Sequence, residues 1–165
     1  MKKMIWLLML MVMLAGCSEP VYETMGNVEH VGQVQGGLRQ VLLDMPEDAS
    51  VLTGSGTDVL YICRDYTMSL QNLPAGDIGG TIRTLCGYDP AQLTVIESRC
   101  GDHKRYDWVW VAAGEEGEVL CRGAVLDDGS SHYSLCVSAD AKLAGELNTD
   151  WNALFDSFCL APKGE

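Results

Sequence analysis

The sequence predicts one α+β domain, in which a mainly antiparallel sheet is packed against helices at about 77–86 and 149–160. Three observations favour this fold class. Short apolar runs typical of strands come first, a capped helical segment follows, and two hairpin-like units run from Tyr106 to Val137 before a closing helix. The predicted domain covers residues 38–165, which is long enough to bury one hydrophobic core.

The predicted strands are short apolar runs bounded by polar or glycine residues. Leu38–Leu43 and Asp58–Cys63 are the first two, and Leu93–Glu97 follows the first helix. The two hairpin-like units supply the remaining strands of the sheet.

Both predicted helices have a start residue and an apolar stripe. Asp77 is a good N-cap for the first helix and Gly87 a good terminator, while Thr149 is the predicted cap of the second. Apolar residues recur at helical spacing at Ile78, Ile82 and Leu85 in the first helix, and at Trp151, Leu154, Phe155 and Phe158 in the second.

The turn at Asp127-Asp128-Gly129 decides the register of the last hairpin. A two-residue turn at Asp128-Gly129 places Cys121 opposite Cys136, whereas a three-residue loop with Gly129 in the left-handed region puts these cysteines on opposite faces. We predict the three-residue loop, because it gathers apolar side chains on one face. That face would hold Val119, Cys121, Gly123 and Val125 with Val137, Leu135, Tyr133 and Ser131.

The preceding turn leaves two registers open. A two-residue loop at Glu115-Glu116 puts two tryptophans on the face of Cys121, and a three-residue loop ending at Gly117 puts two valines there. These residues are Trp108 and Trp110 in the first case, and Val109 and Val111 in the second. Since both faces are apolar, we expect this strand to be covered on both sides. The alternative is an exposed aromatic platform for a partner or a carbohydrate.

Six cysteines lie beyond Cys17, namely Cys63, Cys86, Cys100, Cys121, Cys136 and Cys159. Six cysteines permit about 15 connectivities. We expect some buried free thiols, with Cys86 and Cys159 among them beside the helix stripes, and at most one or two disulfides. Cys100 is the most plausible bridged cysteine. The spacing does not fit a structural zinc site.

The first seventeen residues predict an export signal. Lys2 and Lys3 precede an apolar run, Ile5–Leu14, that is too short to span a bilayer. The ending Leu14-Ala15-Gly16-Cys17 resembles the bacterial lipobox. The resemblance implies that residues 1–16 are a signal peptide removed just before Cys17, and that the sulfur of Cys17 is lipidated, so the protein is a lipid-anchored extracytoplasmic lipoprotein. Ordinary cleavage near Gly16, which leaves a free cysteine, is the alternative.

Residues 17–37 are predicted to be the lipidated N-terminus and a flexible tether. This segment contains several glycines and one proline without a helical period. The spacing of Val28, Val31 and Val34 leaves a short strand or docking segment as the alternative. The residue after the lipidated cysteine is Ser18 and not an aspartate. This choice resembles the signal that sorts lipoproteins to the outer membrane, if the organism has one.

The charge balance excludes nucleic-acid binding. The formal net charge is −12, and removal of Lys2 and Lys3 with the leader lowers it by two, to −14. No cluster of Lys and Arg is present to displace counterions from phosphates. Since an acidic surface disfavours anionic lipids, the acyl chains on Cys17 are the predicted membrane attachment. We interpret the acidity as a source of solubility, with binding of a cation or basic partner as the alternative.

No catalytic, cofactor-binding or metal-ligating residues are predicted. The sequence lacks the nucleophile-elbow, phosphate-loop and zinc-protease motifs. Asp127, Asp128 and His132 form an alternative cation site, although Asp-Asp-Gly is first of all a turn sequence. A cysteine paired with His103 or His132 is a further alternative.

The order of the elements resembles the PsbP/DcrB-like superfamily. The matching features are the helix Asp77–Cys86, a four-strand stretch from Leu93 to Val137, and a last helix ending Asp156-Ser157-Phe158. The resemblance covers about Leu38–Leu160. The resemblance implies an antiparallel sheet with helices packed on it. Because the superfamily includes bacterial lipoproteins without enzymatic activity, it also implies a non-enzymatic role, and it assigns no functional residue.

Three functional hypotheses follow. The first is a non-enzymatic binding or accessory protein of the bacterial cell envelope, with an envelope protein as a possible partner. The second is a solute- or cation-binding lipoprotein, which requires a concave pocket or convergence of Asp127, Asp128 and His132. The third is a thiol-dependent envelope enzyme, which requires an exposed cysteine within hydrogen-bond reach of His103 or His132.

Overall fold

The protein is an α+β domain built on an antiparallel sheet, described by a computed structural model over residues 29–31, 39–55 and 58–162. The strands are β1 (Glu29–Val31), β2 (Val41–Leu43), β3 (Ser50–Ser55), β4 (Asp58–Ile62), β5 (Thr67–Pro74), β6 (Val95–Cys100), β7 (His103–Ala113), β8 (Glu118–Asp127), β9 (Ser131–Asp140) and β10 (Cys159–Leu160). The helices are α2 (Ile78–Cys86) and α3 (Ala144–Ser157), with 3-10 turns η2 (Pro90–Gln92) and η3 (Ala141–Leu143). The predicted fold class is confirmed.

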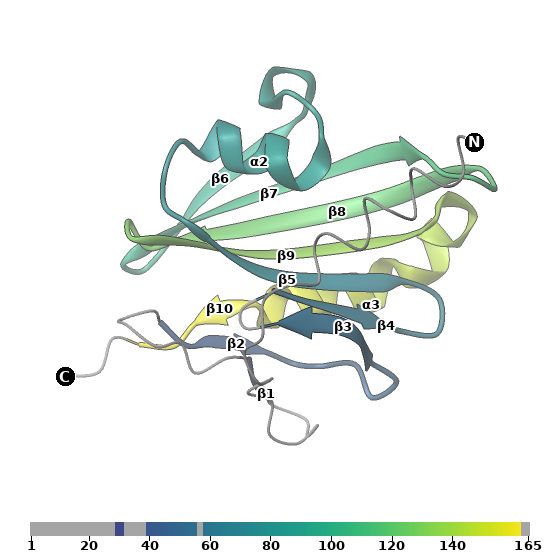
Figure 1. Ribbon diagram of the computed structural model, residues 1–165, viewed down its shortest axis with the longest axis horizontal. Coiled ribbons are helices and arrows are strands. Elements are labelled where there is room, and N and C mark those ends of the chain that lie inside the picture. Colours follow the sequence, from purple (N-terminus) through teal and green to yellow (C-terminus); the bar gives the residue numbers. More distant parts are fainter. Residues whose placement is uncertain (1–28, 32–38, 56–57, 163–165) are drawn as a thin grey trace.

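The large sheet consists of two meanders joined edge to edge. Its order is β3-β4-β5-β9-β8-β7-β6, and every neighbouring pair is antiparallel. After β5 the chain crosses through α2 to the far edge and returns strand by strand until β9 pairs with β5 (Figure 1). A small sheet, β1-β2-β10, lies on the same side as α3.

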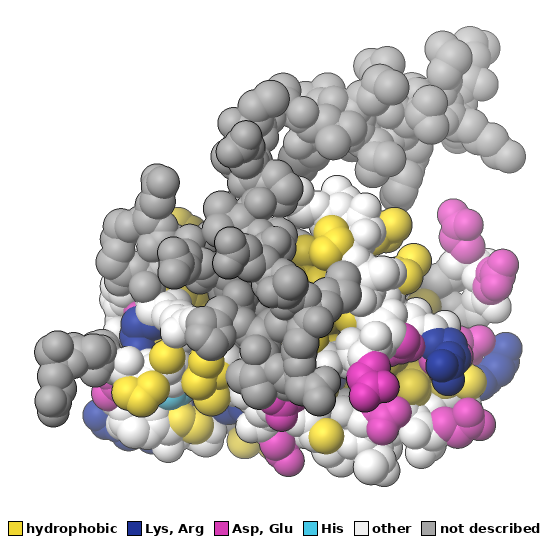
Figure 2. Space-filling view, turned by 90° about the horizontal axis from the view of Figure 1, so that it is seen from below, with side chains coloured by type: hydrophobic (Ala, Val, Ile, Leu, Met, Phe, Trp, Pro, Cys, Tyr) yellow, Lys and Arg dark blue, Asp and Glu magenta, His cyan; other side chains and the backbone are white. Residues whose placement is uncertain are grey.

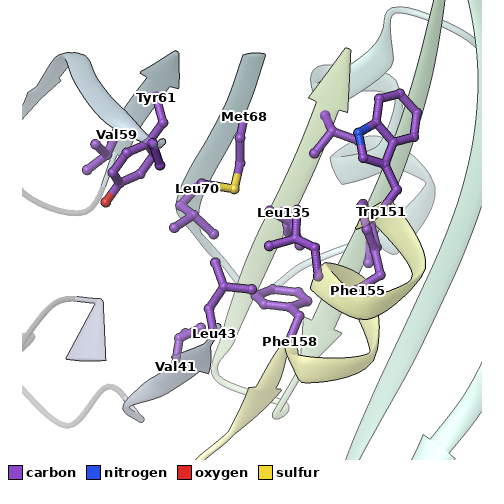
Figure 3. Close-up of a cluster of buried hydrophobic side chains, with 14 of the residues drawn as sticks. Val41, Leu43, Val59, Tyr61, Met68, Leu70, Leu135, Trp151, Phe155 and Phe158 are labelled. Carbon is purple, nitrogen blue, oxygen red and sulfur yellow. The ribbon is translucent and has the colours of Figure 1, made fainter. Parts of the chain in front are cut away.

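One face of the large sheet, called here the α3 face, carries the main core. Side chains of α3, β2 and β10 pack there on alternate residues of β4, β5, β9 and β8. Figure 3 shows this cluster, with Leu43 and Phe158 pointing toward Leu70 and Leu135. Phe155, Met68 and Leu135 are fully buried, so this cluster fixes α3 against the sheet.

The opposite face, called the α2 face, carries a second and smaller core. Ile82 of α2 packs on Tyr106, Trp108 and Val125, which point up from β7 and β8. Trp108 lies across Gly123, where an added Cβ would come within 2.5 Å of the indole. A glycine is therefore required beneath this tryptophan.

Helix α2 has the predicted boundaries. The Asp77 carboxylate accepts a hydrogen bond from the Gly80 N–H at 2.9 Å, and Gly87 ends the helix with φ 78°. Since the two capping residues directly flank the helix and bond to residues within it, the sequence alone identifies this helix.

Helix α3 begins earlier and ends earlier than predicted. It starts at Ala144, after η3, because the Asp140 carboxylate accepts from the Lys142 N–H and starts the turn there. Thr149 therefore lies exposed inside the helix and does not cap it. The predicted apolar stripe is confirmed through Phe155, while Phe158 is extended and leads into β10, which pairs with β2.

The predicted register of the β8–β9 hairpin is wrong. His132 pairs with Asp127 and Cys136 pairs with Gly123, so Cys121 and Cys136 lie on the same face. Asp128 lengthens the turn, because its carboxylate accepts from the N–H groups of Ser130 and Ser131. The apolar pattern did not select the register, since α2 and α3 bury both faces of these strands.

The β7–β8 hairpin takes the first of its two predicted registers. Trp108 pairs with Gly123 and Trp110 with Cys121, around the two-residue loop at Glu115-Glu116. The α2 face of β7 is covered, but on the α3 face Val109 and Val111 are exposed. The expectation that both faces are covered is therefore wrong at this end of β7, which extends beyond α3.

All six cysteines from Cys63 to Cys159 are free, so the disulfide predicted at Cys100 is wrong. Cys86 and Cys159 are free as expected but only half-buried, while Cys63 and Cys121 are buried.

The remaining sequence predictions concern three short strands and the N-terminal segment of the chain. The strands Leu38–Leu43, Asp58–Cys63 and Leu93–Glu97 correspond to β2, β4 and β6, while β3 and β5 were not predicted. The alternative of a short strand within residues 17–37 is realised by β1, which pairs with β2. The rest of that segment and the leader lie outside the described residues.

Candidate functional site

A groove of about 530 Å³ opens where three separate segments meet. Its walls are the loop between β2 and β3, the turn between β4 and β5, and one face of α3. It is lined by Asp44, Pro46, Glu47, Asp48, Arg64, Asp65, Tyr66, Leu147, Asp150, Ala153 and Leu154.

Hydrogen bonds hold the two connecting segments in place. The Asp48 carboxylate accepts from the Arg64 N–H at 2.8 Å, which joins the β2–β3 loop to the β4–β5 turn. The Asp44 N–H donates to Ser157 Oγ at 3.0 Å and attaches the same loop to the end of α3. The groove therefore has a defined shape in the folded chain.

An aromatic contact supports the inner side of the groove. Tyr66 packs edge-to-face on Trp151, with 6.0 Å between ring centroids. Burial raises the pKa of Tyr66, and interactions with the nearby Cys63, Asp48 and Asp150 raise it further. Burial likewise raises the pKa of the Cys63 thiol, although the hydrogen bond with Tyr66 lowers it in part. Both groups are protonated at neutral pH.

The groove is strongly acidic. Five carboxylates and one guanidinium line it, and no ion pair among the described residues neutralises these carboxylates. Figure 2 shows, on the face seen from below, acidic side chains gathered on the right-hand side beside apolar and basic ones. A concave surface lined by one sign of charge concentrates the potential and attracts the opposite sign. The groove can therefore receive a cation or a positively charged group, with Leu147 and Leu154 at its apolar wall.

The cation site that the sequence analysis left as an alternative, Asp127, Asp128 and His132 at the β8–β9 turn, is only partly assembled. Imidazole Nε2 of the fully buried His132 lies 3.7 Å from Asp127 Oδ1, and its Nδ1 shares a 2.7 Å hydrogen bond with Thr81 Oγ1. Burial alone would raise the pKa of Asp128, but hydrogen bonds from Ser130 and Ser131 outweigh it and hold that pKa below its ordinary value. Asp128 thus serves the turn. Over residues 39–55 and 58–162, no group of three or more His, Cys, Asp or Glu side chains is placed to hold a metal ion.

His103 lies in the neighbouring hairpin, where β6 turns into β7, at the same end of the sheet, since the adjacent Lys104 pairs with Asp127. His103 pairs across the strands with Cys100, and its Nδ1 is 3.2 Å from Asp102 Oδ1, which also accepts from Arg39 at 2.9 Å. In the part of the chain that the structure describes, no hydrogen bond joins a thiol to this imidazole or to that of His132. The geometry that the thiol-enzyme hypothesis requires is not assembled there.

Cys121 and Cys136, which lie near each other on the α2 face, are poorly suited to nucleophilic chemistry. Burial raises the pKa of Cys136 to about 12 and that of Cys121 to about 11, with smaller contributions from the neighbouring thiols. Because the thiolate is the nucleophile, thiols with such pKa values react slowly at neutral pH.

The groove residues were missed by the sequence analysis. The acids are spread over about a hundred positions of the sequence, and sequence reasoning interprets the acidity as a source of solubility, with binding of a cation or basic partner as the alternative. They are Asp44, Glu47, Asp48, Asp65 and Asp150. The density of acids in residues 44–48 was the one available signal. The partners of that segment depend on the fold.

No known family model matches the sequence, and no curated protein matches it. Several solved structures share the fold. Cyanobacterial PsbP (CyanoP) from Synechocystis sp. PCC 6803 superimposes with a TM-score of 0.60 at 12% identity, covering 89% of this chain and 99% of that one. LpqN, which is involved in cell envelope biogenesis of Mycobacterium tuberculosis, gives a TM-score of 0.52 at 14% identity, covering 82% and 91%.

A protein from Bacteroides thetaiotaomicron VPI-5482 gives a TM-score of 0.51 at 10% identity, with 76% of this chain aligned to 46% of that one. The fold is therefore PsbP-like, as the order of the elements suggested. Over the described residues, no helix combines the length and the apolar character needed to cross a membrane.

Proposed function

We propose that this chain is a lipid-anchored, extracytoplasmic accessory protein of a bacterial cell envelope that works by binding and not by catalysis. The lipobox-like ending Leu14-Ala15-Gly16-Cys17 carries the proposal. The PsbP-like fold supports it, and one protein with that fold, LpqN, takes part in envelope biogenesis.

The charge of the domain makes the acyl chains on Cys17 the main membrane attachment. A mature formal charge of −14, two below the −12 of the full chain, repels anionic headgroups. Two or more acyl chains anchor a protein stably, because each buried methylene contributes about 0.8 kcal/mol. The domain is then held near the membrane without being inserted in it.

Metabolic labelling tests the anchor. Cells that express the full chain are fed an alkyne analogue of palmitate, and the purified protein is examined for incorporated label. The wild type and a C159S control should incorporate the label equally, while C17S should lose it. An unlabelled wild type, or a C17S variant that is still labelled, would contradict the proposal.

Binding of a cationic solute in the groove is the second candidate function. The observation that favours it is the excess of carboxylates over guanidinium groups in a concave site held by hydrogen bonds. Asp65 of the β4–β5 turn and Asp150 of α3 both line this site, so a bound cation would offset the repulsion among its carboxylates.

Thermal unfolding with calcium, zinc and a short lysine-rich peptide tests this function. A ligand present at 100 times its Kd stabilises the folded state by about 2.7 kcal/mol. The stabilisation should be lost in a D65N/D150N variant and kept in D58N, which changes an exposed carboxylate outside the groove. Equal stabilisation of all three proteins, or of none, counts against the groove as the site.

A further inference from the structure

The two edges of the large sheet differ in their readiness to pair with another strand. At one edge, the register between β3 and β4 shifts at Val51–Thr53, and such an irregularity blocks pairing with a further strand. At the other edge, β6 pairs with β7 without interruption from Val95 to Cys100. Residues 96–99 of β6 are all exposed.

The backbone of β6 offers hydrogen-bonding groups on its free side. The two-residue turn at Gly101-Asp102 closes the hairpin on the pair Cys100–His103. Because bonded and non-bonded pairs alternate along an antiparallel ladder, Val95, Glu97 and Arg99 direct their N–H and C=O groups away from β7. These groups have no strand partner in the described part of the chain.

The side chains on the α2 face of this edge leave one cation without a counter-ion. Lys104 of β7 lies 2.9 Å from Glu97 and is the direct cross-strand partner of Arg99. Like charges directly opposite one another repel. Among the described residues Arg99 has no carboxylate partner, and its guanidinium donates only a long 3.4 Å hydrogen bond to the Gly101 carbonyl.

We propose that β6 pairs antiparallel with β6 of a second copy of this chain, around a two-fold axis at Ser98. This arrangement sets Glu97 of one copy opposite Arg99 of the other, twice, and so supplies the missing carboxylates. It also makes Glu97 and Arg99 the bonded pairs of the new ladder, which matches the direction of their free backbone groups. The two large sheets then continue into one another across the dimer.

The same register brings an apolar residue to the interface on the other face. Ile96 is 61% exposed and lies opposite Cys100 of the second copy. On the same face, Val109 and Val111 lie in β7 just past the Val95–Trp108 pair that ends the ladder with β6, and they are 54% and 46% exposed. The small width of the contact predicts a reversible dimer.

A cysteine at the two-fold axis tests the register. In the S98C variant of the full chain, the two new cysteines are a directly opposed non-bonded pair, with Cα atoms about 4.5 Å apart. That separation is within the range that a disulfide spans. Mild oxidation in cells should give a disulfide-linked dimer on a non-reducing gel, well above the wild type and an S50C control at the β3 edge.

Charge variants of the purified protein test the pairing independently. R99E places a carboxylate opposite Lys104 within the chain, so its thermal stability should not fall, while each interface pair becomes Glu opposite Glu. Sedimentation should show self-association about tenfold weaker than in the wild type. The double variant E97R/R99E exchanges both charges and should restore association.

Two outcomes overturn the proposal. One is an S98C chain that gives no more cross-linked dimer than S50C, including the case in which it cross-links only to a different protein. The other is an association constant that R99E leaves unchanged. These results are independent of the lipid anchor at Cys17.

Discussion

The contact between Trp108 and Gly123 predicts a large effect from the smallest possible substitution. In G123A, the new methyl group lies 2.5 Å from Cζ2 and 2.7 Å from Cε2 of the indole. Ordinary carbon–carbon contacts are about 3.5–4.0 Å, so the ring must move by roughly 1 Å. Trp108 is 2% exposed and packs against Ile82 and Tyr106, which leaves it little room.

The magnitude follows from two opposing terms. Overpacking of a core position destabilises by about 1–3 kcal/mol. Replacement of glycine by alanine also restricts the unfolded chain, which returns about 0.4–1 kcal/mol. We therefore expect G123A to lower the free energy of unfolding by about 1–2 kcal/mol, a decrease in Tm of roughly 4–8 °C for a domain of this size.

Urea denaturation followed by tryptophan fluorescence measures the effect. The midpoint should fall without a change in the slope, since the folded architecture is kept. G145A is the matched control: it lies in α3 with no atom near the added methyl, and should stabilise by about 0.5–1 kcal/mol.

A double-mutant cycle isolates the contact. The smaller ring in W108F leaves space above residue 123, so G123A should cost at least about 0.5 kcal/mol less in that background. A neutral G123A, or an equal penalty in both backgrounds, would refute the packing and the β7–β8 register that produces it.

Three further predictions concern polar groups that are partly or fully buried. R105M should destabilise by about 2–4 kcal/mol in urea unfolding, because the Arg105 guanidinium pairs with both oxygens of Asp107 and donates to two carbonyls at the end of α3; R105K should recover less than half of this. T81V should cost about 1–3 kcal/mol by leaving His132 Nδ1 without its partner, and an unchanged stability would contradict the 2.7 Å bond. Because the pKa of Asp128 is lowered in the folded state, its ionised carboxylate stabilises the fold above pH 3.8, the ordinary pKa of the group. This stabilisation is lost as pH falls through the folded-state pKa. The stability difference between wild type and D128A should therefore be constant from about pH 7 to 5 and shrink below pH 3.8; a difference that grows on acidification would contradict it.

Elements defined by adjacent residues could be predicted from the sequence. Helix α2 is the clearest case, because Asp77 and Gly87 cap it through contacts with their own neighbours. The stripe of α3 was found for the same reason. Its start was missed because Asp140, and not Thr149, makes the first capping bond.

Register and the groove depend on contacts between distant segments. Residues Cys121–Leu126 and Ser134–Val137 are covered by α2 on one face and by α3 on the other, so an apolar pattern cannot tell which face a side chain occupies. The groove brings together acids from the β2–β3 loop, the β4–β5 turn and α3, and no local pattern indicates that these segments meet.

Mass spectrometry of the mature N-terminus is the most direct test of the proposed anchor. The intact protein is extracted from the membrane in detergent, digested, and its first peptide sequenced. We predict that this peptide begins at Cys17 and carries a diacylglyceryl group on the sulfur. A first peptide that retains residues 1–16, or that begins at an unmodified residue beyond Gly16, would contradict the account.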